Sequence, residues 1–359
     1  GLVYVSSTAP ETERNGKFEL TLGSDNARSV GVAFGGAIDR RGAAAFRLSA
    51  QNYRSDGFRT NPFLGIEDSN GRDETSVRGS VETEFADGWT GRLSLLYANI
   101  DNGYDAFALD NGLTVLSDRP GRDAQESIGA SLRLEWQLGG DLTVTSISAL
   151  ADSDIQFDFD ADWGNPDSWS PFVYDFVSVN SRSRRTLSQE IRIGKERWLL
   201  GVYALRLDDI LQTLNLGDYD DPINGFSDSL NSRFDSDYRA TNVAVFGQHS
   251  IAFSDATELS SGLRIERRNT DYVDTAGLDV GPSETMWGAE LSLNRRIDDR
   301  TVVYISASRG YKAGGFNLGA TPPGKQAFDA ESMLTLELGL RARLLDGDVS
   351  IDAAAFRYT

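Results

Sequence analysis

Residues 304–316 of this chain read Y-I-S-A-S-R-G-Y-K-A-G-G-F. Polar and apolar residues alternate along the stretch, which predicts a β-strand with two different faces. Gly314 and Gly315 supply the backbone freedom with which a strand turns into a loop, and Phe316 caps it. We therefore expect a strand that ends here in a glycine-rich turn or bulge.

The same period of two recurs along almost the whole sequence. For example, Leu259, Ser261, Leu263 and Ile265 share one face, whereas the intervening residues include Arg264 and Glu266. Helical spacing fails in these segments, so the pattern predicts an all-β chain. The expected strands are residues 16–23, 28–38, 42–53, 73–85, 89–102, 124–138, 141–157, 176–194, 197–216, 237–253, 257–271, 284–297, 300–313, 331–344 and 348–359.

The connections between these strands alternate in length after the first hairpin. Short turns are expected at residues 39–41, 86–88, 139–140, 195–196, 254–256, 298–299 and 346–347. Long polar loops are expected at residues 54–72, 103–123, 158–175, 217–236, 272–283 and 314–330. In an up-and-down antiparallel sheet, this alternation places all tight turns at one end and all long loops at the other, as in transmembrane barrels.

Composition limits the classes of protein that remain. The chain has 359 residues, no cysteine, and a net charge of −19 from 54 acidic and 35 basic side chains. The absence of cysteine excludes disulfides and thiolate metal sites, and the acidic balance argues against a nucleic-acid partner. No run reaches the eighteen or so apolar residues of a membrane helix, so contact with a bilayer requires β-structure.

A soluble sandwich is the alternative interpretation of the alternating pattern, because amphipathic strands also pack face to face. Strand length favours the membrane: many runs reach ten or more residues, which suits a tilted membrane strand. Charged residues at the other alternating positions suit a water-filled interior, although they would also suit a solvent-exposed face. They are Arg133, Glu135, Arg264, Glu266, Glu290, Glu337, Arg341 and Arg343.

Residues 310–317, G-Y-K-A-G-G-F-N, resemble the G-Y-K-S-G-G-F-N signature of TonB-dependent outer-membrane receptors. The motif positions in this chain are Arg309, Gly310, Tyr311, Lys312, Gly314, Gly315, Phe316 and Asn317. Weaker similarities follow the family's order at residues 1–10, 54–61, 187–193, 198–203 and 328–340. In the first of these, Tyr4 and Thr8 depart from the usual Asn and Lys, and in the last, Ala330 replaces a proline.

The resemblance implies a partial transmembrane antiparallel up-and-down β-barrel, with about fifteen of an expected 22 strands. Residues 1–10 would be the end of the plug domain, and residues 11–359 a C-terminally truncated barrel. The rest of the plug, with its energy-coupling box, would lie upstream, and about seven strands downstream. The implied location is the outer membrane of a Gram-negative cell, where the barrel contacts lipid and the plug contacts the TonB complex.

Family resemblance further implies import of a scarce, bulky solute without any chemistry on it, and no cofactor. A ferric siderophore is the favoured cargo, with a cobalamin, haem or glycan receptor, a passive porin, and a soluble β-rich surface module as alternatives. An outer-membrane hydrolase would have to use His249, the single histidine, but no G-x-S-x-G elbow accompanies it. We therefore expect no enzymatic activity.

Ligand-binding residues are expected in the long loops. Aromatic side chains there suit stacking on a flat solute, and basic ones attract an anionic chelate. The candidates are Tyr104, Phe107, Trp163, Trp169, Tyr174, Tyr219, Arg59 and Lys312, with packing and solubility as the alternative role. Asp158, Asp160 and Asp162 form a possible calcium site, although Trp163 stands where an EF-hand needs glycine.

Overall fold

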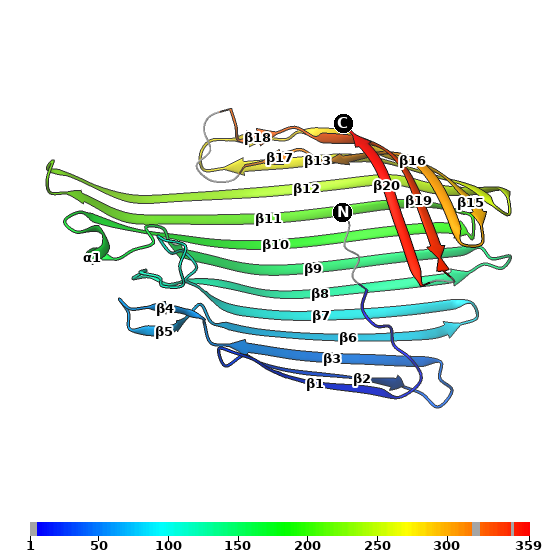
Figure 1. Ribbon diagram of the computed structural model, residues 1–359, viewed down its shortest axis with the longest axis horizontal. Coiled ribbons are helices and arrows are strands. Elements are labelled where there is room, and N and C mark those ends of the chain that lie inside the picture. The colour runs from blue at the N-terminus through cyan, green and yellow to red at the C-terminus, as the bar shows by residue number, and fades with distance from the viewer. Residues whose placement is uncertain (1–5, 318–323, 346–347) are drawn as a thin grey trace.

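A computed structural model describes residues 6–317, 324–345 and 348–359. It contains one large antiparallel sheet in which the long strands pair in chain order. Figure 1 shows that this sheet curls. Its last two strands pass in front of the middle strands, on the side of the sheet where the N-terminal segment lies. The strands are β1 (Asn15–Leu22), β2 (Arg28–Ala37), β3 (Ala44–Ser55), β6 (Arg72–Ala86), β7 (Trp89–Tyr104), β8 (Gly121–Gln137), β9 (Thr143–Asp160), β10 (Val173–Lys195), β11 (Trp198–Asp221), β12 (Phe226–Ser254), β13 (Thr257–Asp274), β15 (Ser283–Asp298), β16 (Thr301–Lys312), β19 (Glu331–Leu344) and β20 (Val349–Tyr358).

Every strand predicted from the period of two is present, so the all-β prediction is confirmed. The connections at one end of the sheet hold the small elements: β4 (Arg59–Asn61), β5 (Ile66–Ser69), α1 (Pro166–Trp169), β14 (Asp279–Val280), β17 (Gly315–Phe316) and β18 (Ala327–Phe328). We call this the loop end, and the opposite side of the sheet the turn end. The turn predicted at 346–347 lies outside the described residues.

The two faces of the sheet differ sharply in chemistry. One face carries an apolar band, formed for example by Leu93 opposite Leu132 and by Val202 opposite Val245. Its side chains are exposed, and no second layer covers them in the described part of the chain. Other exposed members are Leu95, Ile128, Leu200, Val243, Leu263, Ile265, Leu291, Ile305, Leu336 and Leu338. The sandwich alternative is therefore wrong, and the band is what a lipid-facing wall requires.

The opposite face is polar and carries rows of ion pairs. Arg92 lies against Glu82, and Arg182 contacts Asp209 through Nη2 at 2.6 Å. Arg78 Nη1 donates to Ser7 Oγ at 3.4 Å, so the N-terminal segment crosses this face. We call it the inner face. None of the helices in the described residues is long and apolar enough to span a membrane.

Residues 217–236 were predicted as a long loop, and that prediction is wrong. β11 and β12 continue through this region, pairing without interruption from Trp198↔His249 to Asp221↔Phe226. Only residues 222–225 turn, and the Asp221 carboxylate holds them by accepting from the amides of Ile223 and Asn224, each at 3.0 Å. The density of Asp, Asn and Gly suggested a loop, but cross-strand pairing overrides such propensities.

Glycines on the inner face are covered by aromatic rings from the neighbouring strand. Phe246 lies over Gly201, and Tyr304 lies over Gly339, each so closely that a Cβ would overlap the ring. Tyr311 lies beside Gly288 less closely, with its Cε1 3.2 Å from the Cβ position. This arrangement protects glycine backbone in a sheet and fixes the ring.

Replacing Gly201 by alanine should displace Phe246 and the Arg264 guanidinium, which lies 5.7 Å from that ring's centre. We expect the free energy of unfolding to fall by about 1–3 kcal/mol, because the added methyl overpacks the site. Urea unfolding of the full-length protein in lipid vesicles measures this. Gly310→Ala is the matched control, because no atom lies within 4 Å of its Cβ position. Equal losses in both variants would contradict the ring-cover interpretation.

Candidate functional site

The loops between β3 and β6 and between β7 and β8 are joined into one unit at the loop end. Thr60 accepts a backbone hydrogen bond from Val115 at 2.9 Å and donates one to Leu113 at 3.1 Å. The Asn61 amide is fully buried and donates to the Ser117 carbonyl at 2.7 Å. These contacts fix the loops against each other, so the side chains that they carry are positioned rather than free.

Three predicted aromatic residues lie in a first cluster, which we call the β7–β9 aromatic cluster. It comprises Tyr104, Phe107, Phe157, Phe159 and Trp163. Phe107 and Trp163 stack, with ring centroids 4.8 Å apart and planes 9° from parallel. Tyr104 meets Phe107 edge-on at 5.7 Å and Phe157 at 4.5 Å. Trp163 remains 39% exposed, so one ring of the cluster is open to a solute.

The other three predicted aromatics belong to a second cluster, the β10–β12 aromatic cluster. It comprises Trp169, Tyr174, Phe176, Tyr219 and Phe226. Tyr174 is its centre and contacts Trp169 at 5.3 Å, Phe176 at 4.9 Å and Tyr219 at 6.3 Å. Tyr174 is 41% exposed. The structure therefore groups the six predicted rings into two packed patches, where each ring has both a packing role and a partly accessible surface.

The two predicted basic residues lie in different settings. Arg59 Nη1 donates to the Gly112 carbonyl at 3.0 Å, and its guanidinium lies 5.6 Å from the Phe58 ring centre. Its charge is thus used to join two loops. Lys312 is exposed at the last position of β16, opposite Glu331 of β19.

Tyr311 of the family motif connects the strand end to the inner face. Its hydroxyl lies 3.0 Å from Glu266 Oε2 and 3.1 Å from Arg264 Nε. Glu266 is only 7% exposed and also accepts from Arg264 Nη2 at 2.6 Å. Asn242 donates to the other Glu266 oxygen. Tyr311 thereby completes a polar network that spans β12, β13 and β16.

Beyond Tyr311, the motif folds back over the neighbouring strands. Phe316 stacks on Tyr272 of β13, with centroids 4.4 Å apart and planes 8° from parallel. Gly315 pairs with Phe328, whose ring lies 2.7 Å from the position of a Cβ at Gly315. The glycine pair is therefore needed for close approach, whereas the sequence suggested a turn or bulge. Asn317 closes the hairpin by donating to the Lys325 carbonyl at 2.8 Å.

The three aspartates proposed as a calcium site are engaged in local hydrogen bonds. Asp160 Oδ1 accepts from the amides of Asp162 and Trp163 at 3.1 and 3.2 Å. Asp162 accepts from Gly164 N, Trp169 Nε1 and Phe176 N at 2.9, 2.9 and 2.7 Å. Asp158 accepts from Asn180 N at 3.3 Å. No group of three or more metal-ligating side chains is assembled among the described residues, and calcium binding stays a prediction that unfolding with and without a chelator would test.

Asp160 and Asp162 provide a matched pair for testing this loop, which lies beyond the apolar band. Burial raises the pKa of Asp160 from 3.8 to about 6. The ordering of the loop should therefore be strongest below about pH 3.8 and weaken as pH rises through about 6. Asp160→Asn keeps the accepting oxygen and removes the buried charge. We expect it to strengthen amide protection in residues 161–172 at pH 7, by on the order of 1–3 kcal/mol.

Asp162→Asn should have the opposite effect, because an amide nitrogen would then face one of the three donors. Amide hydrogen exchange in the full-length protein reads out both variants, with an expected loss of about 1–3 kcal/mol of local stability for this one. A shift in the same direction for both variants would contradict these assignments.

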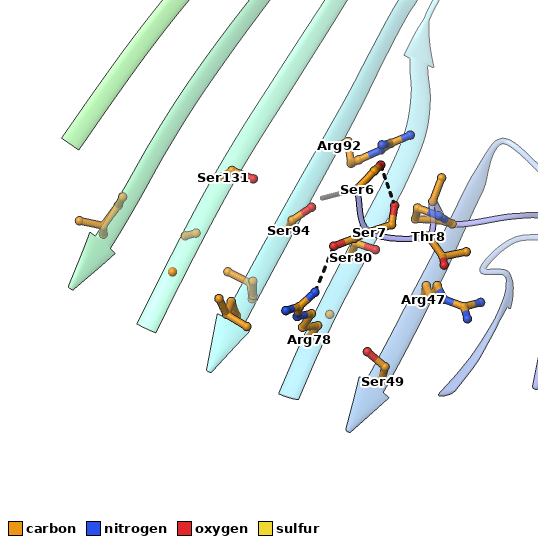
Figure 2. Close-up of a pocket in the computed structure, with 18 residues that line it drawn as sticks. Ser6, Ser7, Thr8, Arg47, Ser49, Arg78, Ser80, Arg92, Ser94 and Ser131 are labelled. Carbon is orange, nitrogen blue, oxygen red and sulfur yellow. Dashed lines mark hydrogen bonds between the residues drawn. The ribbon is translucent and has the colours of Figure 1, made fainter. Parts of the chain in front are cut away.

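A cavity on the inner face lies under the N-terminal segment. It has a volume of about 650 Å³ and is lined by residues 6–10 and by β3, β6, β7 and β8. Figure 2 shows Arg47, Arg78 and Arg92 on the strands around Ser6, Ser7 and Thr8. Arg92 is paired with Glu82, whereas Arg47 donates to Asn15 Oδ1 at 2.9 Å and Arg78 to Ser7. The predicted similarity at residues 1–5 lies outside the described residues.

Comparison with known protein families identifies the family of this chain. Residues 14–359 match the family described as TonB dependent receptor-like, beta-barrel. The chain belongs to this family. The resemblance inferred from the motif is thus confirmed, as is the outer-membrane location. The family is one of transporters, so the enzyme alternative built on His249 falls away.

Solved structures of similar fold agree. The ferric yersiniabactin uptake receptor FyuA from Yersinia pestis has a TM-score of 0.72 and 17% identity, over 98% of this chain and 55% of that one. The siderophore receptor PiuA from Acinetobacter baumannii has a TM-score of 0.71 and 13% identity, over 98% and 57%. The copper transporter OprC has 0.67 and 13%, over 98% and 54%. The chain spans a little over half of each of these structures, and at such identities the likeness shows the fold alone.

The sequence identified Tyr311 in the motif and Arg264 and Glu266 as candidates for the water-filled face, but it did not connect them with one another or with Asn242. Glu266 and Asn242 lie on β13 and β12, and only the register across four strands brings them to the motif. The sequence signal that could have found them is a polar residue at one of the alternate positions of a strand whose side chains face inward.

Removing only the Tyr311 hydroxyl should destabilise the network, because Glu266 and Arg264 each lose a hydrogen-bond partner. We expect Tyr311→Phe to lower the free energy of unfolding by about 1–3 kcal/mol. Urea unfolding in lipid vesicles measures it. In the control, Tyr97→Phe, the lost bond to Glu126 is long, at 3.3 Å, and exposed, so little change is expected. No difference between the two variants would rule out a structural role for the motif hydroxyl.

Proposed function

We propose that this chain forms the barrel wall of a TonB-coupled import receptor for a ferric siderophore. Membership of the receptor family carries the proposal. The uncovered apolar band supports contact between the barrel and lipid. The polar inner face supports a water-filled interior that holds a plug. Transport would use energy delivered through TonB, with outer-membrane lipid around the barrel and no nucleic-acid partner.

The domain division is proposed on the same basis. Residues 1–10 would be the end of the plug, and residues 11–359 the barrel. The described part of the first segment, residues 6–10, lies against the inner face beside Arg78, as a segment leaving a plug would. The family match begins at residue 14, close to the proposed boundary.

Siderophore cargo rests on the loop-end aromatics and on the names of similar structures. FyuA takes up ferric yersiniabactin, and PiuA is a siderophore receptor, whereas OprC transports copper. The exposed rings of Trp163 and Tyr174 offer stacking surfaces for a planar chelating group. The proposed contacts remain Tyr104, Phe107, Trp163, Trp169, Tyr174, Tyr219, Arg59 and Lys312.

Uptake of radioactive iron by a strain that carries the full-length gene, compared with its deletion strain, tests the function. Catecholate, hydroxamate and mixed-ligand ferric chelates are supplied in turn, and uptake of at least one should require both the gene and TonB. Uptake that persists without TonB would indicate a passive pore. Binding of cobalamin, haem or an oligosaccharide, with no ferric chelate bound, would overturn the siderophore assignment.

Truncating the two exposed rings tests the binding surface. The double variant Trp163→Ala/Tyr174→Ala should bind the transported chelate about 5–150-fold more weakly, since each of the two stacking contacts is worth about 0.5–1.5 kcal/mol. Equilibrium binding to the purified full-length receptor measures it. Trp136→Ala is the control, because Trp136 stacks on Trp89 near the turn end of the sheet. Unchanged affinity in the double variant would assign these rings to packing.

A further inference from the structure

The β11–β12 hairpin ends in a three-stranded region that we call the arm, formed by residues 173–176, 214–221 and 226–235. β11 is the central strand and pairs with both neighbours, for example Tyr219 with Tyr174 and with Asp228. β13 joins β12 only from Ser236↔Asp274 onward. Figure 1 shows β11 and β12 reaching farther at the loop end than the strands on either side. The arm therefore has two edges that β9 and β13 do not cover.

One of these edges is capped at Phe176 of β10 by the loop 161–172. Ala161 N donates to the Phe176 carbonyl at 2.8 Å, and Phe176 N donates to the Asp162 carboxylate at 2.7 Å. The helix α1 belongs to the same cap and packs beside β10. Both the donor and the acceptor of Phe176 are thus satisfied.

The β12 edge is open. Asp235 N and O bond to Thr275, at the end of β13, which identifies the side of β12 that faces away from β11. Because this direction recurs at every second residue, the backbone groups of Arg233, Asn231, Ser229 and Ser227 point the same way. In the described residues, Ser229 N alone among these amides has a partner, the Asp228 carboxylate at 2.8 Å. Residues 226–233 are exposed throughout.

Exposed strand edges normally carry features that prevent pairing, such as proline, charged side chains (above all lysine), or a bulge. Residues 226–235, F-S-D-S-L-N-S-R-F-D, contain neither proline nor lysine, and their register with β11 is unbroken. Their charged residues are Asp228, Arg233 and Asp235, which disfavour some partners and not others. Ten residues extend for about 33 Å, enough to pair with a full strand. The edge is therefore a competent template for strand addition.

Charge selects the occupant. Residues 226–235 carry Asp228, Asp235 and Arg233, and Arg233 Nε lies 2.8 Å from Asp235 Oδ2. The paired end of β11 adds Asp218, Asp220 and Asp221, so residues 217–236 have a net charge of −4. A second copy of the arm would bring two such charges together, which disfavours edge-to-edge pairing of this chain with itself. A cationic segment is favoured for the same reason.

We propose that residues 226–235 of β12 are a strand-addition site outside the membrane, where an extended, basic segment of a protein partner pairs with the open edge. Main-chain hydrogen bonds would supply affinity, and the aspartates would supply selectivity. The site borders the β10–β12 aromatic cluster, because Phe226 lies 5.8 Å from Tyr219. Its pairing groups are the edge-facing backbone amides and carbonyls of residues 227–233 and not the rings, so the proposal does not depend on the identity of the transported solute.

Binding of a fluorescein-labelled ten-residue peptide of alternating lysine and valine to the full-length receptor in nanodiscs tests the site. Asn231→Pro removes an edge-facing N–H without touching the β11 ladder, and Asn231→Ala removes the same side chain but keeps the N–H. We expect wild type and Asn231→Ala to bind alike, and Asn231→Pro at least about tenfold more weakly. Binding should also weaken with salt and fail for the glutamate–valine peptide. When the peptide binds, the amides of residues 227–233 should become protected from hydrogen exchange in the wild type and in Asn231→Ala. The exchange of residues 236–254 should be the same in all three proteins.

Equal binding by Asn231→Pro and Asn231→Ala, equal binding of the acidic peptide, or no binding by wild type would overturn the proposal. So would amides at 227–233 that are already protected without peptide, which would indicate that another segment of the receptor covers the edge. Receptor dimers that Asn231→Pro abolishes would identify a second copy as the occupant and likewise overturn it.

Discussion

The structure depends on one constraint: every backbone amide and carbonyl of a sheet in lipid must find its partner in the adjacent strand. Fifteen strands in an unbroken antiparallel order meet this requirement between the outer strands β1 and β20, each of which pairs on one side only. Irregularities are confined to pairs beside tight turns, such as Ser254↔Thr257. Because successive side chains point to opposite faces, the same pairing separates lipid-facing leucine and valine from lumen-facing arginine and glutamate. Packing in layers, which holds most proteins together, contributes little here.

Periodicity made the strands predictable for this reason. A wall with lipid on one side and water on the other gives each residue only one of two environments, so alternation survives in segments such as residues 259–266. It failed at residues 217–236, because beyond the bilayer both faces are wet and the aspartates no longer alternate with apolar residues. The strand continues there on main-chain pairing and contacts such as Tyr219 with Phe226.

The functional residues were only partly predictable. Six aromatic residues were identified by type and loop position, and each does lie at the loop end, but their division into two clusters depends on folding of loops far apart in sequence. The motif was identified from its residue types alone. Its structural role lies in the contacts of Tyr311 with Glu266 and of Phe316 with Tyr272, and these contacts depend on the register of several strands. The aspartates at 160 and 162 suggested a cation site, which stays a prediction, and the structure shows that they accept hydrogen bonds from backbone amides. The sequence could not distinguish cation binding from hydrogen bonding to backbone amides, because a carboxylate can do either.

The four-residue turn at 222–225 sits at the far tip of the longest hairpin and is fully exposed, with Gly225 at a φ of +67°. In the described chain, the backbone hydrogen bonds of this turn are made to Asp221 alone, by the amides of Ile223, Asn224 and Gly225. It is consequently a natural place to insert an epitope tag or a fluorophore-accepting cysteine. Such a label would report surface display on living cells while leaving the wall and its lumen undisturbed.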